Sequence, residues 1–244
     1  MTDAALAKSS LAEPVLSVRG LNAWYGDSHV LQGMDFDVMA GEVVSILGRN
    51  GVGKTTTLRA IMGILPKRSG SVSVFDQETI KMAPRSVARL GVGYCPEERG
   101  IFASLTVKEN LMLPPVVGKH AVHLDEIFEM FPNLKERLAS PGTKLSGGEQ
   151  QMLAIARILR SGSRLLLLDE PTEGLAPVIV QQIGATIRRL KERGFTIILV
   201  EQGLHFVRSI ADRHYLVEHG QIARSVDNKG LLENMDSIRG LLAL

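Results

Sequence analysis

Residues 48–55 read GRNGVGKT and match the phosphate-loop pattern G-x-x-x-x-G-K-[ST] at every fixed position. The apolar run EVVSILG at 42–48 leads into them, and KTTTLRAIMG at 54–63 follows with a helical pattern that ends at glycine. A strand, a glycine loop and a helix in this order predict an α/β fold whose loop holds the phosphates of a nucleotide. The alternative, an accidental glycine-rich turn, does not account for these flanking elements.

Each residue type in the loop has a chemical reason. Gly48, Gly51 and Gly53 allow the tight turns that aim backbone N–H groups at phosphate oxygens. Lys54 supplies a compact positive charge to the outer phosphates, which makes it a candidate catalytic residue, and Thr55 offers a hydroxyl to Mg²⁺. The predicted nucleotide-binding set within the loop is Gly48, Arg49, Asn50, Gly51, Val52, Gly53, Lys54, Thr55 and Thr56.

Two acids end a second apolar run, LLLLDE at 165–170. Asp169 is placed to hold Mg²⁺, directly or through water, and Glu170 to polarise the water that attacks a γ-phosphate. Two solvated acids at a strand end are the plain alternative, and the phosphate loop weakens it. The run FTIILVE at 195–201 is equally apolar, and both runs are typical of buried strands in a parallel sheet.

The remaining segments predict further elements around this core. Residues 14–21 and 30–38 read as antiparallel strands, and a hairpin is expected around His219–Gly220. From about 104 to 159 the pattern is helical, with one helix opening at about Glu149. The chain therefore combines a βα core with a helical insertion and some antiparallel strands.

The composition excludes several classes of protein. The formal net charge is only +2, which argues against a nucleic-acid partner. No apolar run is long enough to span a membrane, and residues 1–13, predicted to be a flexible tail, lack the pattern of a signal peptide. Cys95 is the single cysteine, so no internal disulfide is possible. We therefore expect a cytoplasmic protein.

The segment LSGGEQQ at 145–151 resembles the signature motif of the ABC ATPase family. Further motifs follow the family's order from about Val15 to Ser225, and no guanine-reading Asn-Lys-x-Asp motif of GTPases accompanies them. Besides the phosphate loop they are Tyr25 at the position of the adenine-stacking aromatic residue, CPEE at 95–98 at the glutamine loop, DEPTEGLAP at 169–177, and EQG at 201–203 at the switch histidine.

This resemblance implies a P-loop ABC ATPase fold, with a mainly parallel core sheet, helices, an antiparallel β subdomain and a helical insertion. Residues 14–244 would form one such domain, with a helical subdomain at about 98–160. The cofactors implied are ATP and Mg²⁺. The implied roles are catalysis by Glu170, Lys54 and Gln202, metal binding by Thr55, Asp169 and Glu97, and binding of a partner subunit's ATP by Ser146, Gly147, Gly148 and Glu149 of the signature.

Within the family the chain is similar to the smaller ATPase of branched-chain amino acid importers. The segments that carry this closer similarity are PEERGIF at 96–102, TVKENL at 106–111, LSGGEQQMLAIAR at 145–157, EGLAP at 173–177 and LVEQ at 199–202. The similarity implies a peripheral position on the cytoplasmic face of the cell membrane, next to membrane permease subunits. A second ABC ATPase subunit, identical or related, and an extracytoplasmic solute-binding protein would complete the system.

Three positions depart from the broad family pattern: Glu97 replaces the usual glutamine, Ala176 an aspartate and Gln202 the switch histidine. A carboxylate still ligates Mg²⁺, and an amide still donates to a γ-phosphate without titrating near neutrality. Three alternatives stay open, and only the last of them is suggested by Ala176 and Gln202. They are the ATPase of a urea or amide importer, a soluble ABC ATPase outside transport, and a regulatory subunit with little activity.

Overall fold

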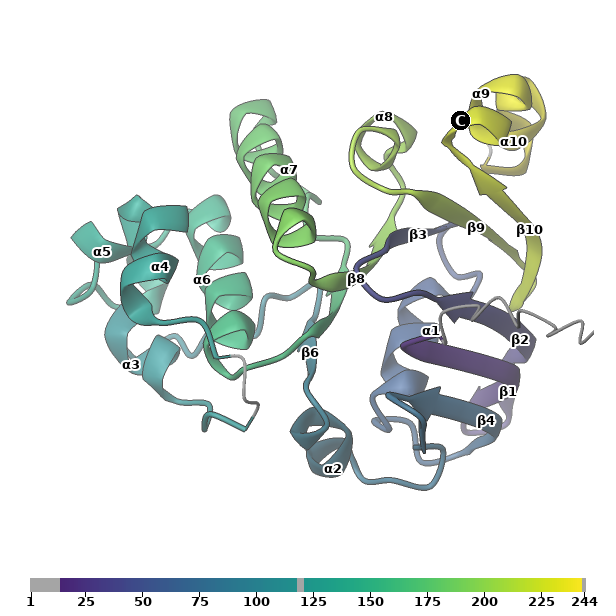
Figure 1. Cartoon of the computed structure of the whole chain (residues 1–244), viewed down its shortest axis with the longest axis horizontal. Helices are drawn as coiled ribbons and strands as arrows, with labels where there is room; N and C mark the ends of the chain where they lie inside the picture. Colours follow the sequence, from purple (N-terminus) through teal and green to yellow (C-terminus); the bar gives the residue numbers. More distant parts are fainter. Residues whose placement is uncertain (1–13, 118–120, 243–244) are drawn as a thin grey trace, which may run out of the picture.

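Within the described residues, 14–117 and 121–242, a computed structural model shows ten strands in two sheets (Figure 1). The predicted flexible tail at residues 1–13 lies outside these residues. Most strands of both sheets are segments whose alternation or apolar character was visible in the sequence. The fold therefore follows mainly from which of these segments pair with one another.

The larger sheet carries the phosphate loop. Its strand order is β10-β9-β3-β8-β7-β6, and all neighbouring pairs are parallel except β10 with β9. Every residue of β3, β7 and β8 is buried, which confirms the buried parallel strands predicted from the apolar runs. The strands are β3 Val43–Leu47, β6 Val92–Cys95, β7 Leu165–Asp169, β8 Thr196–Glu201, β9 Arg213–Glu218 and β10 Gln221–Asp227.

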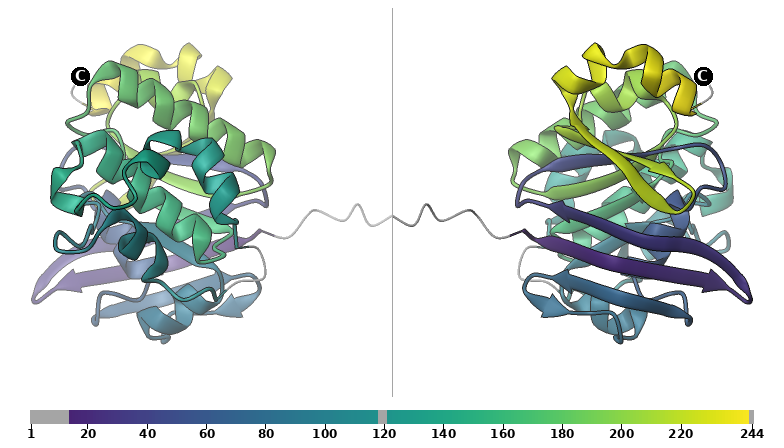
Figure 2. Two further views of the ribbon diagram at one scale, coloured as in Figure 1. Left: turned by 90° about the vertical axis from the view of Figure 1, so that its left-hand side faces the viewer. Right: turned by 90° about the vertical axis from the view of Figure 1, so that its right-hand side faces the viewer.

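The smaller sheet is antiparallel and has the order β2-β1-β4-β5. It confirms the predicted pair of N-terminal strands, and Gly26 with φ 57° stands in the turn between them. The right-hand view of Figure 2 shows these strands beside the β9–β10 hairpin. The strands are β1 Leu16–Tyr25, β2 Ser28–Val38, β4 Arg68–Val74 and β5 Gln77–Glu78.

The helices form a group of their own and a set packed around the sheets (Figure 1). The group comprises α3 Val107–Met112, α4 Leu124–Met130, α5 Pro132–Glu136, α6 Gly147–Arg160 and a 3₁₀ turn at Gly142–Lys144, which confirms the helical middle of the chain. The others are α1 Lys54–Ile61, α2 Pro84–Arg89, α7 Pro177–Glu192, α8 Leu204–Arg208, α9 Asn228–Glu233 and α10 Met235–Leu242. Among these helices none combines the length and apolar character that a membrane crossing needs.

Two hydrophobic cores lie on opposite faces of the larger sheet because successive strand residues point to opposite sides. On β7, Leu166 and Leu168 join a core built with α6 and α7, whereas Leu165 and Leu167 join a core built with β1, β2 and α1. The sheet is thus covered by helices that include α6 and α7 on one face and by the antiparallel strands and α1 on the other. This arrangement leaves the ends of its parallel strands for a site.

Two features differ from the sequence prediction. Strand β6 was missed because Gly93 lies in its middle, where an added Cβ would lie 2.9 Å from the Cβ of Ser163. Gly93 allows the strand to pack closely against its neighbours, but a glycine weakens the alternating pattern by which a strand is predicted from sequence. Helix α6 begins at Gly147, earlier than the predicted Glu149, because Ser146 and Glu149 form a capping box.

Candidate functional site

The phosphate loop, the end of β7 and the end of β8 meet at one edge of the parallel sheet. A cavity of about 320 Å³ opens there. Nine of its lining residues belong to the predicted site, and Glu173 is the addition. The lining residues are Asn50, Gly51, Gly53, Lys54, Thr55, Thr56, Glu97, Glu170, Glu173 and Gln202.

Lys54 opens helix α1 and is almost fully buried, with 4% of its surface exposed. Its Nζ donates hydrogen bonds to the carbonyls of Gly48 at 3.0 Å and Arg49 at 3.2 Å, and lies 3.4 Å from Oε1 of Glu170. These contacts offset the free-energy cost of removing the ammonium group from water. Its charge is therefore fixed beside the glycine loop, which is where a phosphoryl group would need it.

The turn between β9 and β10 is hydrogen-bonded to the phosphate loop. The N–H of Gly220 donates to the carbonyl of Val52 at 3.1 Å, and its carbonyl accepts from the N–H of Gln32 at 2.9 Å. An added Cβ on Gly220 would lie 2.0 Å from the carbonyl oxygen of Val30, and its φ is 73°. Glycine is therefore required at this contact.

Asp169 ends β7 with 1% of its surface exposed. Thr55 donates to its Oδ1 at 2.9 Å, and the hydroxyl of Tyr94 on β6 donates to its Oδ2 at 3.0 Å. Burial raises the pKa of Asp169, and these two hydrogen bonds oppose the rise. Sequence reasoning missed Tyr94 because it missed β6.

The oxygen atoms around Thr55 and Asp169 suit Mg²⁺, which prefers hard oxygen ligands. Glu97 lines the same cavity and adds a further carboxylate. Across the described part of the chain no cluster of three or more His, Cys, Asp or Glu could hold a metal by itself. Mg²⁺ does not need one, since it is bound through one or two carboxylates together with substrate phosphates and water.

Glu170 follows Asp169 and adopts φ 42°, a left-handed conformation that is uncommon for residues other than glycine. Three contacts hold it there. Its N–H donates to the carbonyl of Val200 at 2.9 Å, its Oε1 faces Lys54, and its Oε2 accepts a 2.8 Å hydrogen bond from Nε2 of Gln202. Gln202, which stands where the switch histidine is expected, therefore contacts the candidate general base directly.

Glu201 is a buried carboxyl next to this site that sequence reasoning did not select. It has 4% of its surface exposed, and its Oε1 accepts hydrogen bonds from both the N–H (3.1 Å) and the hydroxyl (2.7 Å) of Thr172. Burial raises the pKa of Glu201 to about 7, with a further contribution from the negative charge of Glu170. The only sequence signal was an acid ending an apolar strand.

The raised pKa of Glu201 predicts a pH dependence of stability. Between its ordinary value of 4.5 and about 7 the folded chain binds more protons than the unfolded chain, so the free energy of unfolding falls as pH rises. We expect this carboxyl to contribute a loss of about 3 kcal/mol across that window. Urea denaturation at pH 5 and pH 8 should show a smaller loss for Glu201→Gln than for the wild type. The exposed Glu218→Gln is the matched control, and equal losses in all three proteins would contradict the assignment.

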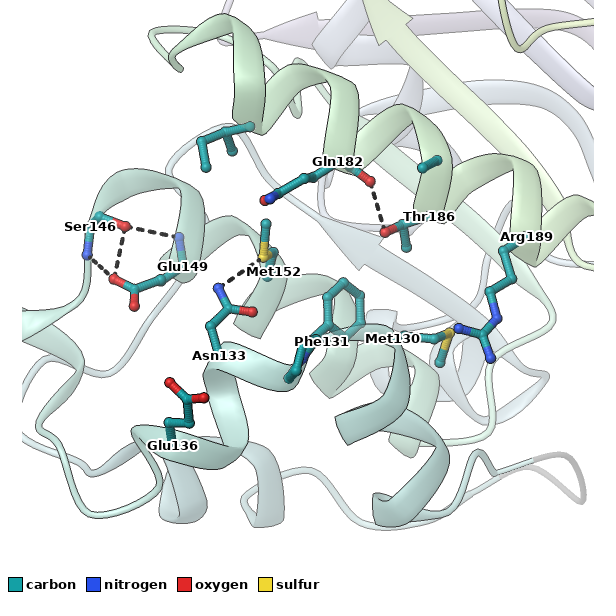
Figure 3. A pocket seen from close by; sticks show the side chains of 13 residues that line it. Met130, Phe131, Asn133, Glu136, Ser146, Glu149, Met152, Gln182, Thr186 and Arg189 are labelled. Atoms are coloured by element: carbon teal, nitrogen blue, oxygen red, sulfur yellow. Dashed lines mark hydrogen bonds between the residues drawn. The ribbon is translucent and has the colours of Figure 1, made fainter.

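The signature residues lie elsewhere, at the start of α6 beside a second cavity of about 720 Å³ (Figure 3). Ser146 and Glu149 form the capping box, in which the Ser146 hydroxyl donates to Oε2 of Glu149 at 2.8 Å and accepts from its N–H at 3.3 Å. An added Cβ on Gly148 would lie 2.6 Å from Cγ2 of Ile179, so this glycine lets α6 approach α7. The two cavities share no lining residue.

Tyr25 and Ala176 lie at the margins of the site. Tyr25 ends β1 with 43% of its surface exposed, and its hydroxyl accepts from Nη1 of Arg59 on α1 at 3.5 Å, but it does not line the phosphate cavity. Ala176 occupies the N-cap position of α7 and has no side-chain acceptor for the first turn. An aspartate at this position would supply that acceptor.

The family model described as "ABC transporter" matches residues 31–173, more than half of the chain. The chain belongs to the ABC transporter family. The high-affinity branched-chain amino acid transport ATP-binding protein BraG of Pseudomonas aeruginosa is 39% identical over 223 residues, 90% of this chain and 96% of that protein. The probable branched-chain amino acid transport ATP-binding protein LivF of Archaeoglobus fulgidus is 36% identical, with 88% and 92% covered. A nucleotide-free ATP-binding cassette of an ABC transporter has the same fold, with a TM-score of 0.81, 23% identity and 94% and 97% coverage.

These likenesses confirm the predicted ABC ATPase fold and an ATP-hydrolysing activity. The chain covers nearly the whole length of its named ABC relatives, so the comparison extends over the entire ATPase unit. A bacterial ABC transporter cassette with this fold has been solved as a dimer, and its post-hydrolysis state has been solved bound to ADP and phosphate.

Proposed function

We propose that this ABC ATPase powers a membrane importer for branched-chain or related amino acids, as a peripheral subunit on the cytoplasmic face of the membrane. The separation of Ser146 and Glu149 of the signature from the Lys54 cavity carries the proposal, because a second anion-binding helix start outside that cavity suits a pair of subunits that shares two ATP molecules. The substrate class rests on the named functions of the two transport relatives.

In the proposed mechanism Lys54 and the N–H groups of the glycine loop bind and neutralise the outer phosphates of ATP. Thr55, Asp169 and Glu97 would hold Mg²⁺, which supplies charge neutralisation and orientation of the phosphates. Glu170 accepts a proton from the attacking water, while Gln202 fixes the orientation of its carboxylate.

The signature completes the site of the partner subunit in this proposal. Ser146 would exchange its hydrogen bond with Glu149 for one to a γ-phosphate, and the N-terminus of α6 adds the positive end of the helix dipole. Bound ATP would then hold two subunits together, and its hydrolysis would release them. Gly147 and Gly148 would contribute their backbone N–H groups to the partner's phosphate, while the α-carbon of Gly148 packs against Ile179.

Tyr25 is proposed to stack on the adenine ring, which its exposed position allows. Replacement by alanine should weaken ATP binding by about 1–3 kcal/mol, the range found when an aromatic side chain that stacks on a base is removed. Titration with a fluorescent ATP analogue measures the effect. Tyr25→Phe keeps the ring and should bind nearly as well, and an equal loss in both variants would assign the effect to the hydroxyl instead.

The permease is proposed to dock on the segment between Phe102 and Val116. Four large apolar side chains of this segment are about half exposed: Phe102 50%, Met112 46%, Leu113 50% and Val116 53%. Glu97 precedes the segment and lines the phosphate cavity, so a membrane helix seated here would lie close to the metal site. Several exposed large apolar side chains within one short segment favour an interaction surface there.

Purification of the chain with its membrane partners tests the whole proposal. A permease should co-purify, and ATP hydrolysis by the reconstituted complex should rise when the solute-binding protein carries a branched-chain amino acid. Stimulation by urea or short amides alone would favour the related importer class. A chain that hydrolyses ATP without any permease would favour a soluble ABC ATPase, and a complex without turnover would favour a regulatory subunit.

A further inference from the structure

The carboxyl end of β8 holds the segment that carries Glu170 by three successive residues. The carbonyl of Val200 accepts from the N–H of Glu170 at 2.9 Å, Glu201 accepts two hydrogen bonds from Thr172, and Gln202 donates to Glu170 at 2.8 Å. Glu170 and Thr172 flank a buried proline, Pro171. The turn after β7 is therefore fixed on both sides of its bend.

We propose that Glu201, through Thr172, is a positioning residue that fixes the general base Glu170 for hydrolysis. The inference rests on the proposed role of Glu170. Glu201 does not line the phosphate cavity, so it acts through the turn and not on the nucleotide.

Two observations set Glu201 apart from an ordinary packed side chain. A carboxyl with 4% exposure is costly to bury, and its hydrogen bonds compensate that cost only while Thr172 stays in place. Glu170 also sits at φ 42°, a conformation that persists only where surrounding contacts enforce it. The carboxyl and the turn therefore constrain each other.

The same turn continues into residues 173–176 and helix α7. The N–H of Glu173 donates to the carbonyl of Glu170 at 3.1 Å, and Leu175 borders Gly147 of the signature, where an added Cβ would lie 3.2 Å from its Cδ2. A displacement at Thr172 would therefore reach both the base and the signature. Small displacements of a catalytic group are costly, since a misplacement of about 1 Å can lower a rate by about 10²-fold.

Thr172→Val tests the inference with little change in volume, and Thr172→Ser is its matched control because serine keeps the hydroxyl. On the full-length chain we expect Thr172→Val to lower kcat by at least about tenfold, with ATP affinity unchanged within about twofold. Thr172→Ser should keep most of the turnover. Loss of ATP affinity with an intact kcat would overturn the inference.

The Glu170→Gln background separates positioning from general destabilisation. If Thr172 acts only through the base, Thr172→Val should add no further loss to the residual turnover of Glu170→Gln. An equal further loss in that background would show a merely structural role and overturn the inference. Normal hydrolysis by Glu170→Gln alone would instead refute the base assignment of the proposed function, so the two failures are distinguishable.

Discussion

Glu170→Gln is expected to bind ATP normally and to lower turnover by about 10²–10⁴-fold, the contribution of a positioned general base. The amide keeps the shape of the side chain and loses the ability to take a proton from water. Phosphate release measures turnover, and equilibrium titration measures ATP affinity. Because hydrolysis would no longer separate two ATP-bound subunits, size-exclusion chromatography in ATP should show the variant as a dimer.

Glu173→Gln is the matched control for this experiment. Glu173 lines the same cavity but has neither the Lys54 contact nor the Gln202 hydrogen bond that Glu170 makes. The control removes one negative charge from the cavity and should keep most of the turnover. Comparable losses in the two variants would assign the effect to cavity charge, and unimpaired turnover by Glu170→Gln would end the case for Glu170 as the base.

A mixture of two inactive variants is expected to recover activity. Lys54→Ala removes the buried ammonium of the phosphate cavity, and Ser146→Asp places a negative charge at the signature where a partner's phosphate would bind. Each variant alone should lose more than about 10²-fold in turnover. Random pairing would make about half of the dimers mixed, each with one intact site, so the mixture should reach about a quarter of wild-type activity.

Two controls accompany the mixing experiment. Aspartate is a good helix cap, so Ser146→Asp should keep α6 folded, which circular dichroism checks. Ser146→Thr keeps the hydroxyl and should remain active on its own. A mixture that never exceeds the sum of its two components would show that each chain uses both cradles on one nucleotide.

The sequence predicted the elements that short runs of neighbouring residues define. The run at 165–170 and the run at 195–201 became adjacent buried strands, and the glycine loop joined β3 to α1. Motif spacing also placed Lys54, Thr55, Glu170 and Gln202 around one cavity, since residues at the carboxyl ends of parallel strands meet at one sheet edge.

The missed features depend on tertiary contacts. Gly93 in strand β6 packs closely against Ser163, and a glycine weakens the sequence pattern of a strand. The strand was therefore not predicted, and neither was the hydrogen bond from Tyr94 to Asp169. Glu201 looked like one more acid at a strand end, and only its burial and its bonds to Thr172 distinguish it. The roles assigned to the site residues, and the boundaries of the helical subdomain near residues 98 and 160, stay predictions.

The hydrogen bond from Gly220 in the β9–β10 turn to Val52 ties the phosphate loop to a neighbouring hairpin and so limits the motion of the loop. Ordering a flexible loop costs about 1–2 kcal/mol of backbone entropy per residue, and a loop already held in shape avoids that cost on association. Nucleotide capture by this chain should therefore be a rapid single-step encounter. If the proposed pairing of subunits holds, we expect the slow steps of the cycle to be the association and dissociation of subunits and not the ordering of this loop.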